Sequence, residues 1–321
     1  MALPLASSSD SLARMRQWIW GRRAFDRDAA PIYLVISILV AFLAVALEYF
    51  GFRYDRGFVR GNVIVLGTFL GFAAAARWIG FPRLASMLEA WILLIAVSAL
   101  TALCAFVAAA LDRPLVDAVL AAIDLRLFGF SRDLLASFAV SQPVAFRATV
   151  VVYDTLSLQP FVLLPALIAF NQRQRAWMFL LAWSLALAFC LAVSPFAPAR
   201  GTPPYVLEWI DVFDGARAGS LRTLDASVLT GIITFPSFHA AGAVVLAWGT
   251  AASRFMKWPM IALNAAVAVS AVLVGGHYII DVVAGAAVGA AAIYAARCVY
   301  YGFPRRQRRS RIISEPLQAP A

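Results

Sequence analysis

Long apolar runs are the feature that most constrains how this chain can fold. The stretches 31–51, 87–111 and 176–196 each contain at most one charged residue. An apolar helix of about 20 residues is long enough to cross the hydrocarbon core of a bilayer. Hydrophobic residues make up 63% of the chain and charged residues 14%, whereas soluble domains are about half apolar and a quarter charged. We therefore expect an all-α, polytopic membrane helical bundle.

About eight transmembrane helices are expected from these runs. Residues 112–147 mix apolar positions at helical spacing with Asp and Arg, which predicts one or two amphipathic helices at the membrane surface, or an ordinary structured loop. The chain then divides into an N-terminal segment (1–30), N-terminal helices with the amphipathic segment (31–148), a core (149–301) and a basic tail (302–321). The predicted spans are 31–51, 62–78, 87–111, 148–170, 176–196, 236–252, 258–275 and 276–301.

The basic residues predict an orientation in the membrane. With eight spans both termini lie on one side, which then carries 17 of the 27 lysines and arginines. The positive-inside rule places that side in the cytoplasm, as in a bacterial inner membrane. The net charge of +10 is then a topology signal, with attraction of the tail to anionic lipid, and not a nucleic-acid-binding surface. The long polar loop 197–235 and the turn 275–277 are expected on the extracytoplasmic side.

Two short segments near the ends of predicted spans carry the chemistry. They read TFPSFHAAGAVV from Thr234 and GGHYIIDVVAG from Gly275, and they hold His239 and His277, the only two histidines of the chain. An ionisable group in a membrane helix points to a functional site by default. If a helix begins near Gly276, Asp281 lies on the same face as His277 and can accept a hydrogen bond from its ring.

The first segment predicts an anion site. Thr234 is expected to cap a helix in which Pro236 occupies the first turn. The backbone amides of Ser237, Phe238 and His239 then point out of a helix N-terminus, where phosphate binds favourably. A histidine that faces this site can act as nucleophile, and a second can protonate a leaving oxygen.

The two segments resemble the second and third motifs of the type-2 phosphatidic acid phosphatase superfamily, which includes membrane lipid phosphatases and haloperoxidases. The resemblance covers roughly residues 149–300 and implies the helical core of that family. It also implies that His277 forms a phosphohistidine intermediate, that Asp281 orients it and that His239 is the acid for the leaving alcohol. Ser237 is implied to contact phosphate, and no cofactor or metal is implied. The implied substrate is a lipid phosphate ester.

The chain departs from the family pattern at three points. Phe238 stands where the second motif has glycine, and Ser270 and Ala271 stand where the third motif has Ser-Arg. In the region where the first motif is expected, the chain has only ARGTPP. The candidate phosphate-binding arginines are therefore Arg200 and, as second choice, Arg222. These departures resemble the inositolphosphotransferase branch, whose members make inositol phosphorylceramide. They leave open whether water or an alcohol accepts the phosphoryl group.

Two other interpretations of the histidines remain open at this point. His239, His277 and Asp281 could hold a catalytic zinc ion, because three ligands plus water suit such a site. A non-enzymatic transporter could use the His–Asp pair as a proton relay, although we see no internal repeat of the kind many transporters have. The sequence fixes neither the lipid nor the oligomeric state.

Overall fold

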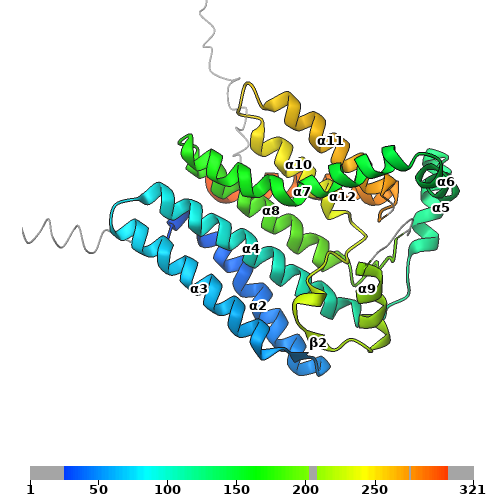
Figure 1. The fold of residues 1–321 in the computed structure, drawn as a ribbon, viewed down its shortest axis with the longest axis horizontal. Helices are drawn as coiled ribbons and strands as arrows, with labels where there is room; N and C mark the ends of the chain where they lie inside the picture. Colours follow the sequence, from blue (N-terminus) through cyan, green and yellow to red (C-terminus); the bar gives the residue numbers. More distant parts are fainter. Residues whose placement is uncertain (1–24, 202–207, 275, 303–321) are drawn as a thin grey trace, which may run out of the picture.

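The fold was analysed in a computed structural model that describes residues 25–201, 208–274 and 276–302. Most of the segment 1–30 and nearly all of the tail 302–321 lie outside the described residues. Eleven α-helices lie in the described part of the chain (Figure 1). They are α2 (Ala30–Phe50), α3 (Arg56–Trp78), α4 (Pro82–Ala109), α5 (Asp117–Phe128), α6 (Arg132–Ser141), α7 (Pro143–Ala169), α8 (Arg173–Val193), α9 (Glu208–Ala218), α10 (Phe238–Thr250), α11 (Lys257–Leu273) and α12 (Ile279–Tyr301).

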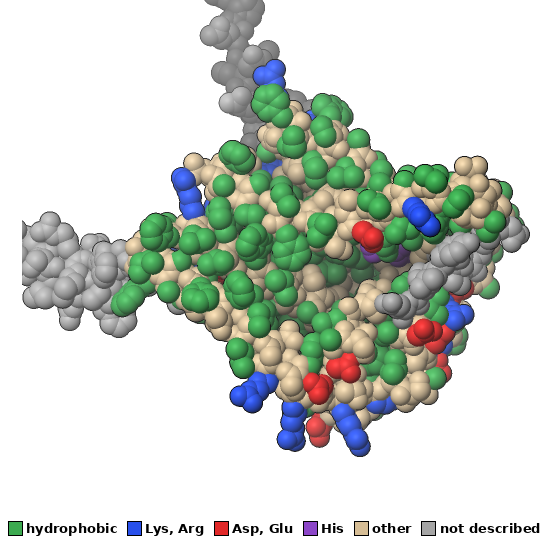
Figure 2. Space-filling model, viewed as in Figure 1, with side chains coloured by type: hydrophobic (Ala, Val, Ile, Leu, Met, Phe, Trp, Pro, Cys, Tyr) green, Lys and Arg blue, Asp and Glu red, His purple; other side chains and the backbone are tan. Residues whose placement is uncertain are grey.

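Six of these helices are long and apolar enough to cross a membrane, namely α2, α3, α4, α7, α8 and α12. The helices α10 and α11 are apolar but shorter, with 13 and 17 residues. Large apolar side chains are exposed along α2, α3 and α7, and in Figure 2 they cover much of the visible face. The prediction of an all-α integral membrane bundle is confirmed, with six candidate spans and two shorter apolar helices in the described residues, where about eight spans were expected.

The helix α10 lies at the centre of the second half of the bundle. It packs against α7, α8, α11 and α12, while α4 packs against both α7 and α8. The helices α2 and α3 pack on α4 and form the other side of the molecule (Figure 1). The expected boundary at residue 148 falls inside α7, which begins at Pro143.

A buried ionic network joins the first helices to this bundle at the end where α2 begins. Glu89 of α4 is fully buried and accepts hydrogen bonds from the Tyr33 hydroxyl (2.9 Å), the Arg77 guanidinium (2.7 Å) and the Asp26 amide (3.1 Å). The Asp26 carboxylate in turn pairs with Arg173 of α8. Breaking one member of such a network leaves an uncompensated buried charge, so these contacts fix how α2, α3, α4 and α8 meet.

The opposite end of the bundle carries the connections that surround both histidine segments. The region 112–147 contains two helices, α5 and α6. This agrees with the expectation of one or two helices there, and not with that of an ordinary structured loop. The loop 197–235 is more structured than a plain polar loop, because it contains α9 and the strand β2 (Thr223–Leu224). This strand pairs in parallel with β1 (Arg53–Tyr54), which follows α2. The connection after α8 is thereby tied to the first two helices.

Two glycines of α12 let its backbone approach α10. A Cβ atom at Gly285 would lie 2.1 Å from the Ser237 carbonyl oxygen, and one at Gly289 would lie 2.6 Å from the Ala241 carbonyl oxygen. Small residues four positions apart permit this close packing between membrane helices. The two histidines lie at or just before the starts of these helices, so the glycine contacts set the distance between them.

We predict that Gly285→Ala lowers the thermal stability of the protein, because the new methyl group must push the backbone of α10 away from α12. Overpacking of this kind costs about 1–3 kcal/mol. Gly71→Ala in α3 is the matched control, since a Cβ atom there meets nothing within 4 Å. The fraction of protein that stays monodisperse after heating in detergent measures the effect. Equal melting of the two variants would contradict this account of the contact.

Candidate active site

The structure brings the two histidines together at one end of α10 and α12. His239 is the second residue of α10, and His277 lies two residues before α12 begins. Their ring centroids are 5.7 Å apart. His277 is buried and His239 is partly exposed, and Figure 2 shows histidine atoms in a recess of the surface. One phosphorus atom between the rings could therefore be reached from both.

The ring of His277 is held by a backbone carbonyl. Its Nδ1 atom lies 2.9 Å from the carbonyl oxygen of Thr234 and 3.7 Å from Oδ2 of Asp281. A carbonyl oxygen can only accept, so Nδ1 carries the proton and Nε2 keeps its lone pair. The predicted hydrogen bond from His277 to Asp281 is therefore wrong in this geometry, because the carboxylate is an ion-pair neighbour beyond hydrogen-bond distance.

The carboxylate of Asp281 also organises the start of α12. The helix begins at Ile279 and not near Gly276 as predicted, and Asp281 is its third residue. Oδ2 of Asp281 accepts a hydrogen bond from the Tyr278 amide (2.8 Å). The carboxylate is fully buried, and its Oδ1 atom has no hydrogen-bond partner among the described residues. The Oδ2 atom thus faces both the Tyr278 amide and the His277 ring.

Ser237 caps α10 and joins the two segments. Its hydroxyl accepts a hydrogen bond from the Ala240 amide (3.4 Å), and its own amide donates to the carbonyl oxygen of Asp281 (3.1 Å). The prediction that Thr234 is the helix cap is wrong, since the turn through Pro236 lies outside the helix. The amides of Phe238 and His239 are the first two of α10, where the helix supplies no acceptor for them.

Tyr153 of α7 is a site neighbour to which the sequence analysis assigned no role. Its ring stacks on His239 with the centroids 3.9 Å apart and the planes at 18°. Its hydroxyl lies 3.2 Å from Nδ1 of His239. Nothing in its local sequence marks this role, because the contact depends on how α7 crosses α10.

The two candidate arginines lie in different places. The backbone of Arg200 is close to the histidine segments, because a Cβ atom at the neighbouring Gly201 would lie 2.5 Å from the Gly276 carbonyl oxygen. The Arg200 side chain, however, pairs with Asp214 of α9 at 2.5 Å. Arg222 stacks over the ring of Phe52, 4.9 Å from its centroid, in the loop tied to α2. The structure thus brings the Arg200 backbone to the site, and it directs neither guanidinium to the histidines.

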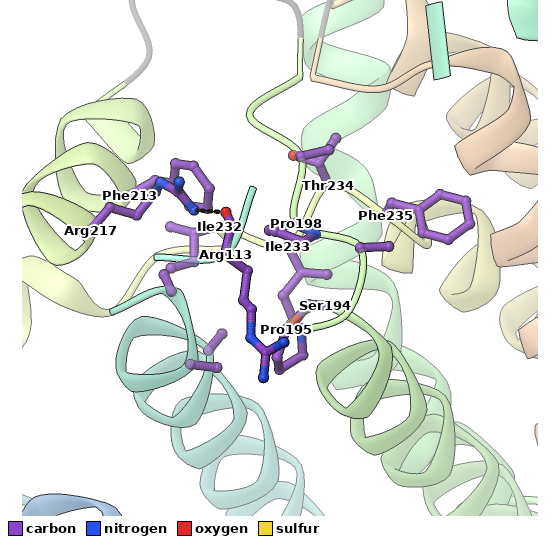
Figure 3. Close-up of a pocket in the computed structure, with 15 residues that line it drawn as sticks. Arg113, Ser194, Pro195, Pro198, Phe213, Arg217, Ile232, Ile233, Thr234 and Phe235 are labelled. Carbon is purple, nitrogen blue, oxygen red and sulfur yellow. Dashed lines mark hydrogen bonds between the residues drawn. The ribbon is translucent and has the colours of Figure 1, made fainter. Parts of the chain in front are cut away.

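A small pocket adjoins the start of the segment that holds His239 (Figure 3). Arg113, Ser194, Thr234 and Phe235 are among its lining residues, and neither histidine is. The Arg113 carbonyl accepts a hydrogen bond from Arg217 (3.0 Å). For the zinc interpretation, no cluster of three His, Cys, Asp or Glu side chains that could hold a metal occurs within the described residues.

Comparison with protein families gives one match. A model of the PAP2 superfamily matches residues 118–295, which is more than half of the chain. The matched region begins in α5, includes both histidine segments and ends in α12. Comparisons with curated proteins and with solved structures found no match. The family match, together with the paired histidines, shows that this chain belongs to the PAP2 superfamily.

Proposed function

We propose that the protein transfers the phosphoryl group of a lipid phosphate ester through a phosphohistidine formed on His277. Membership of the PAP2 superfamily supports a phosphatase-type lipid phosphoesterase. The membrane bundle supports a lipid as the substrate, because a site between apolar helices is accessible to molecules of the bilayer. The observation that carries the proposal is the pairing of a nucleophile-type histidine with a second histidine 5.7 Å away, centroid to centroid.

The hydrogen bond to Thr234 supports His277 as the nucleophile. It keeps the proton on Nδ1 and leaves Nε2 free to attack phosphorus. Attack on phosphorus makes the imidazole ring cationic. The Asp281 carboxylate, at 3.7 Å, then stabilises that charge by about 4 kcal/mol at an effective dielectric constant near 20. Asp281 thus acts on the charge that develops, while Thr234 sets the tautomer.

Tyr153 supports the opposite role for His239. As the acid of the first step, His239 must be an imidazolium, in which both ring nitrogens carry a proton, so that Nδ1–H donates to the Tyr153 hydroxyl oxygen. Nε2–H then protonates the oxygen of the departing alcohol, and the neutral ring that results can take a proton back on Nε2. A protonated His239 ring would also gain a cation–π contact with the stacked face of Tyr153.

The start of α10 is the proposed phosphate site. The amides of Phe238 and His239 and the Ser237 hydroxyl are close to the His277 ring segment, and a helix N-terminus favours anions. The Phe238 ring, which replaces the family's glycine, packs edge-on against Trp183 at 4.9 Å and so is accommodated in the bundle. Arg200 can contribute if it leaves Asp214, an exposed pair of little energetic value. Arg222 is the less favoured candidate, because it is stacked over Phe52.

The reaction then has two balanced steps. In the first, Nε2 of His277 bonds to phosphorus, the bond from phosphorus to the alcohol oxygen breaks, and His239 gives that oxygen a proton. In the second, an acceptor oxygen bonds to phosphorus, the bond from phosphorus to Nε2 of His277 breaks, and His239 takes the proton of the acceptor. Water as acceptor gives a phosphatase. An alcohol gives a phosphotransferase, which the motif departures at Phe238 and Ala271 favour through their likeness to the inositolphosphotransferase branch.

We place the site at the extracytoplasmic end of the bundle. The basic residues favour cytoplasmic termini, and the site lies at the end opposite to the start of α2. The substrate phosphate would then be presented from the outer leaflet.

His277→Ala is expected to abolish turnover while the protein remains folded, because no other group can take the phosphoryl group. Phosphate release by purified protein in detergent, with EDTA present, measures this for phosphatidic acid, an isoprenyl diphosphate and a phosphoinositide. If wild-type protein releases no phosphate, transfer of a labelled headgroup to ceramide or diacylglycerol is measured next. An active His277→Ala variant would sink the proposed mechanism.

The acid role of His239 predicts a dependence on the leaving group. His239→Ala should reduce kcat about 100-fold for a lipid phosphate, whose alkoxide needs a proton, and far less for an aryl phosphate, whose phenolate leaves without one. Tyr153→Phe keeps the stacking but removes the hydroxyl, and should show a smaller loss, about tenfold, with the same selectivity. Equal losses on both substrates would assign His239 and Tyr153 to binding or folding instead.

A further inference from the structure

The helix α5 presents one face to the segments that carry the site. Asp117, Leu120 and Asp124 recur at helical spacing on that face. Leu120 is buried in a small cluster with Ala199 and Tyr278. The same helix exposes large apolar side chains elsewhere, including Val119, Leu125 and Leu127. The exposed side of α5 is therefore apolar, while Asp117 and Asp124 are turned to the segments that carry the site.

Asp124 holds the first turn of α12. Its Oδ2 atom accepts a hydrogen bond from the Ile279 amide (2.7 Å), and its Oδ1 atom accepts one from the Ile280 amide (3.0 Å). These are the first two amides of α12, which have no acceptor within the helix. The carboxylate is buried and is stabilised by the positive end of the helix dipole. It anchors the chain two residues after His277.

Asp117 holds the loop on the other side of the same segment. Its carboxylate accepts hydrogen bonds from the amides of Arg200 and Gly201, both at 2.9 Å, and from the Tyr278 hydroxyl at 3.0 Å. Gly201 in turn touches the backbone of Gly276. The residues on both sides of His277 are thus tied to α5 by two carboxylates that are about two helical turns apart.

The carboxylates at the start of α12 restrict where a phosphate can bind. Asp124 and Asp281 together occupy the amides at the start of α12, and their charge repels an anion there. The start of α10 carries no carboxylate cap, since Ser237 is its cap. The substrate phosphate is therefore directed to α10, on the side of the His277 ring where Nε2 can reach it.

We propose that Asp117, Leu120 and Asp124 form an α5 clamp that positions the His277 segment for attack. Asp124 is its main positioning residue, because it accepts hydrogen bonds from the first two amides of α12, for which the helix has no acceptor. The proposal rests on the proposed function in one respect only, that His277 is the nucleophile. The positioning itself is a property of the folded protein before substrate binds.

The kinetic test compares Asp124→Ala and Asp124→Asn with wild-type protein. The rate of each is divided by the amount of folded protein. Displacing a reacting group by about 1 Å can cost about 100-fold in rate, so we expect a loss of this size in kcat for Asp124→Ala. Asp124→Asn keeps one acceptor oxygen and should lose about tenfold, with KM changed little in both. Asp225→Asn is the control, because Asp225 also accepts a hydrogen bond from a backbone amide at the start of a helix, the 3-10 helix Ala226–Val228 in the connection 197–235.

A second readout needs no substrate. The chain has two histidines, so protein labelled with ¹⁵N-histidine gives two sets of ring nitrogen signals, which His277→Gln and His239→Gln assign. We expect both Asp124 variants to shift or broaden the His277 signals and to leave those of His239 unchanged. Asp225→Asn should change neither set. If the Asp124→Ala protein cannot be recovered in a folded state, the test uses Asp124→Asn instead, because asparagine keeps the shape of the side chain.

The two readouts separate the clamp from the function. If wild-type protein transfers no phosphoryl group, the proposed function fails and the nitrogen signals alone decide on the clamp. A shift confined to His277 supports it. Unchanged His277 signals in a folded Asp124 variant, or a fall in kcat no larger than that of Asp225→Asn, would overturn it.

Discussion

The close contact between the start of α10 and the first turns of α12 is the constraint on which the site depends. Gly285 admits the Ser237 carbonyl, and the Ser237 amide donates to the Asp281 carbonyl (3.1 Å). One end of this contact carries the proposed phosphate site and the other carries the proposed nucleophile. A side chain at Gly285 would separate them by more than catalysis tolerates, since about 1 Å of misplacement can cost 100-fold.

Backbone groups and carboxylates share the work of holding the two rings. The Thr234 carbonyl fixes the tautomer of His277, and the Tyr153 hydroxyl holds the ring of His239 through Nδ1, which leaves Nε2 for the proton transfer. The carboxylates of Asp281 and Asp124 take the amides at the start of α12, and Asp281 also faces the ring on which charge develops. Two chemically identical side chains can thereby take different parts in one reaction.

The sequence allowed much of the fold to be predicted, because long apolar runs leave few alternatives to a membrane bundle and the histidine motifs have a fixed local pattern. The pairing of His277 with Thr234, and the start of α12 at Ile279, could not be predicted, because each depends on a backbone turn set by tertiary contacts. The roles of Tyr153 and Asp124 were missed for the same reason. Both residues belong to helices that are distant in sequence from the histidines, and the sequence of α5 indicated only an amphipathic segment. Arg200 and Arg222 were chosen because they lie in or near the region where the first family motif is expected, and the structure pairs both guanidiniums elsewhere.

The measurement that tests the central claim most directly is the identification of the covalent intermediate. Protein incubated briefly with a phosphate-labelled substrate that it turns over is quenched, digested and analysed by mass spectrometry and ³¹P NMR. We predict one phosphorylated residue, His277, modified on Nε2, because Nδ1 is occupied by the Thr234 carbonyl. Label on another residue, label on Nδ1, or turnover with no covalent intermediate would contradict the account.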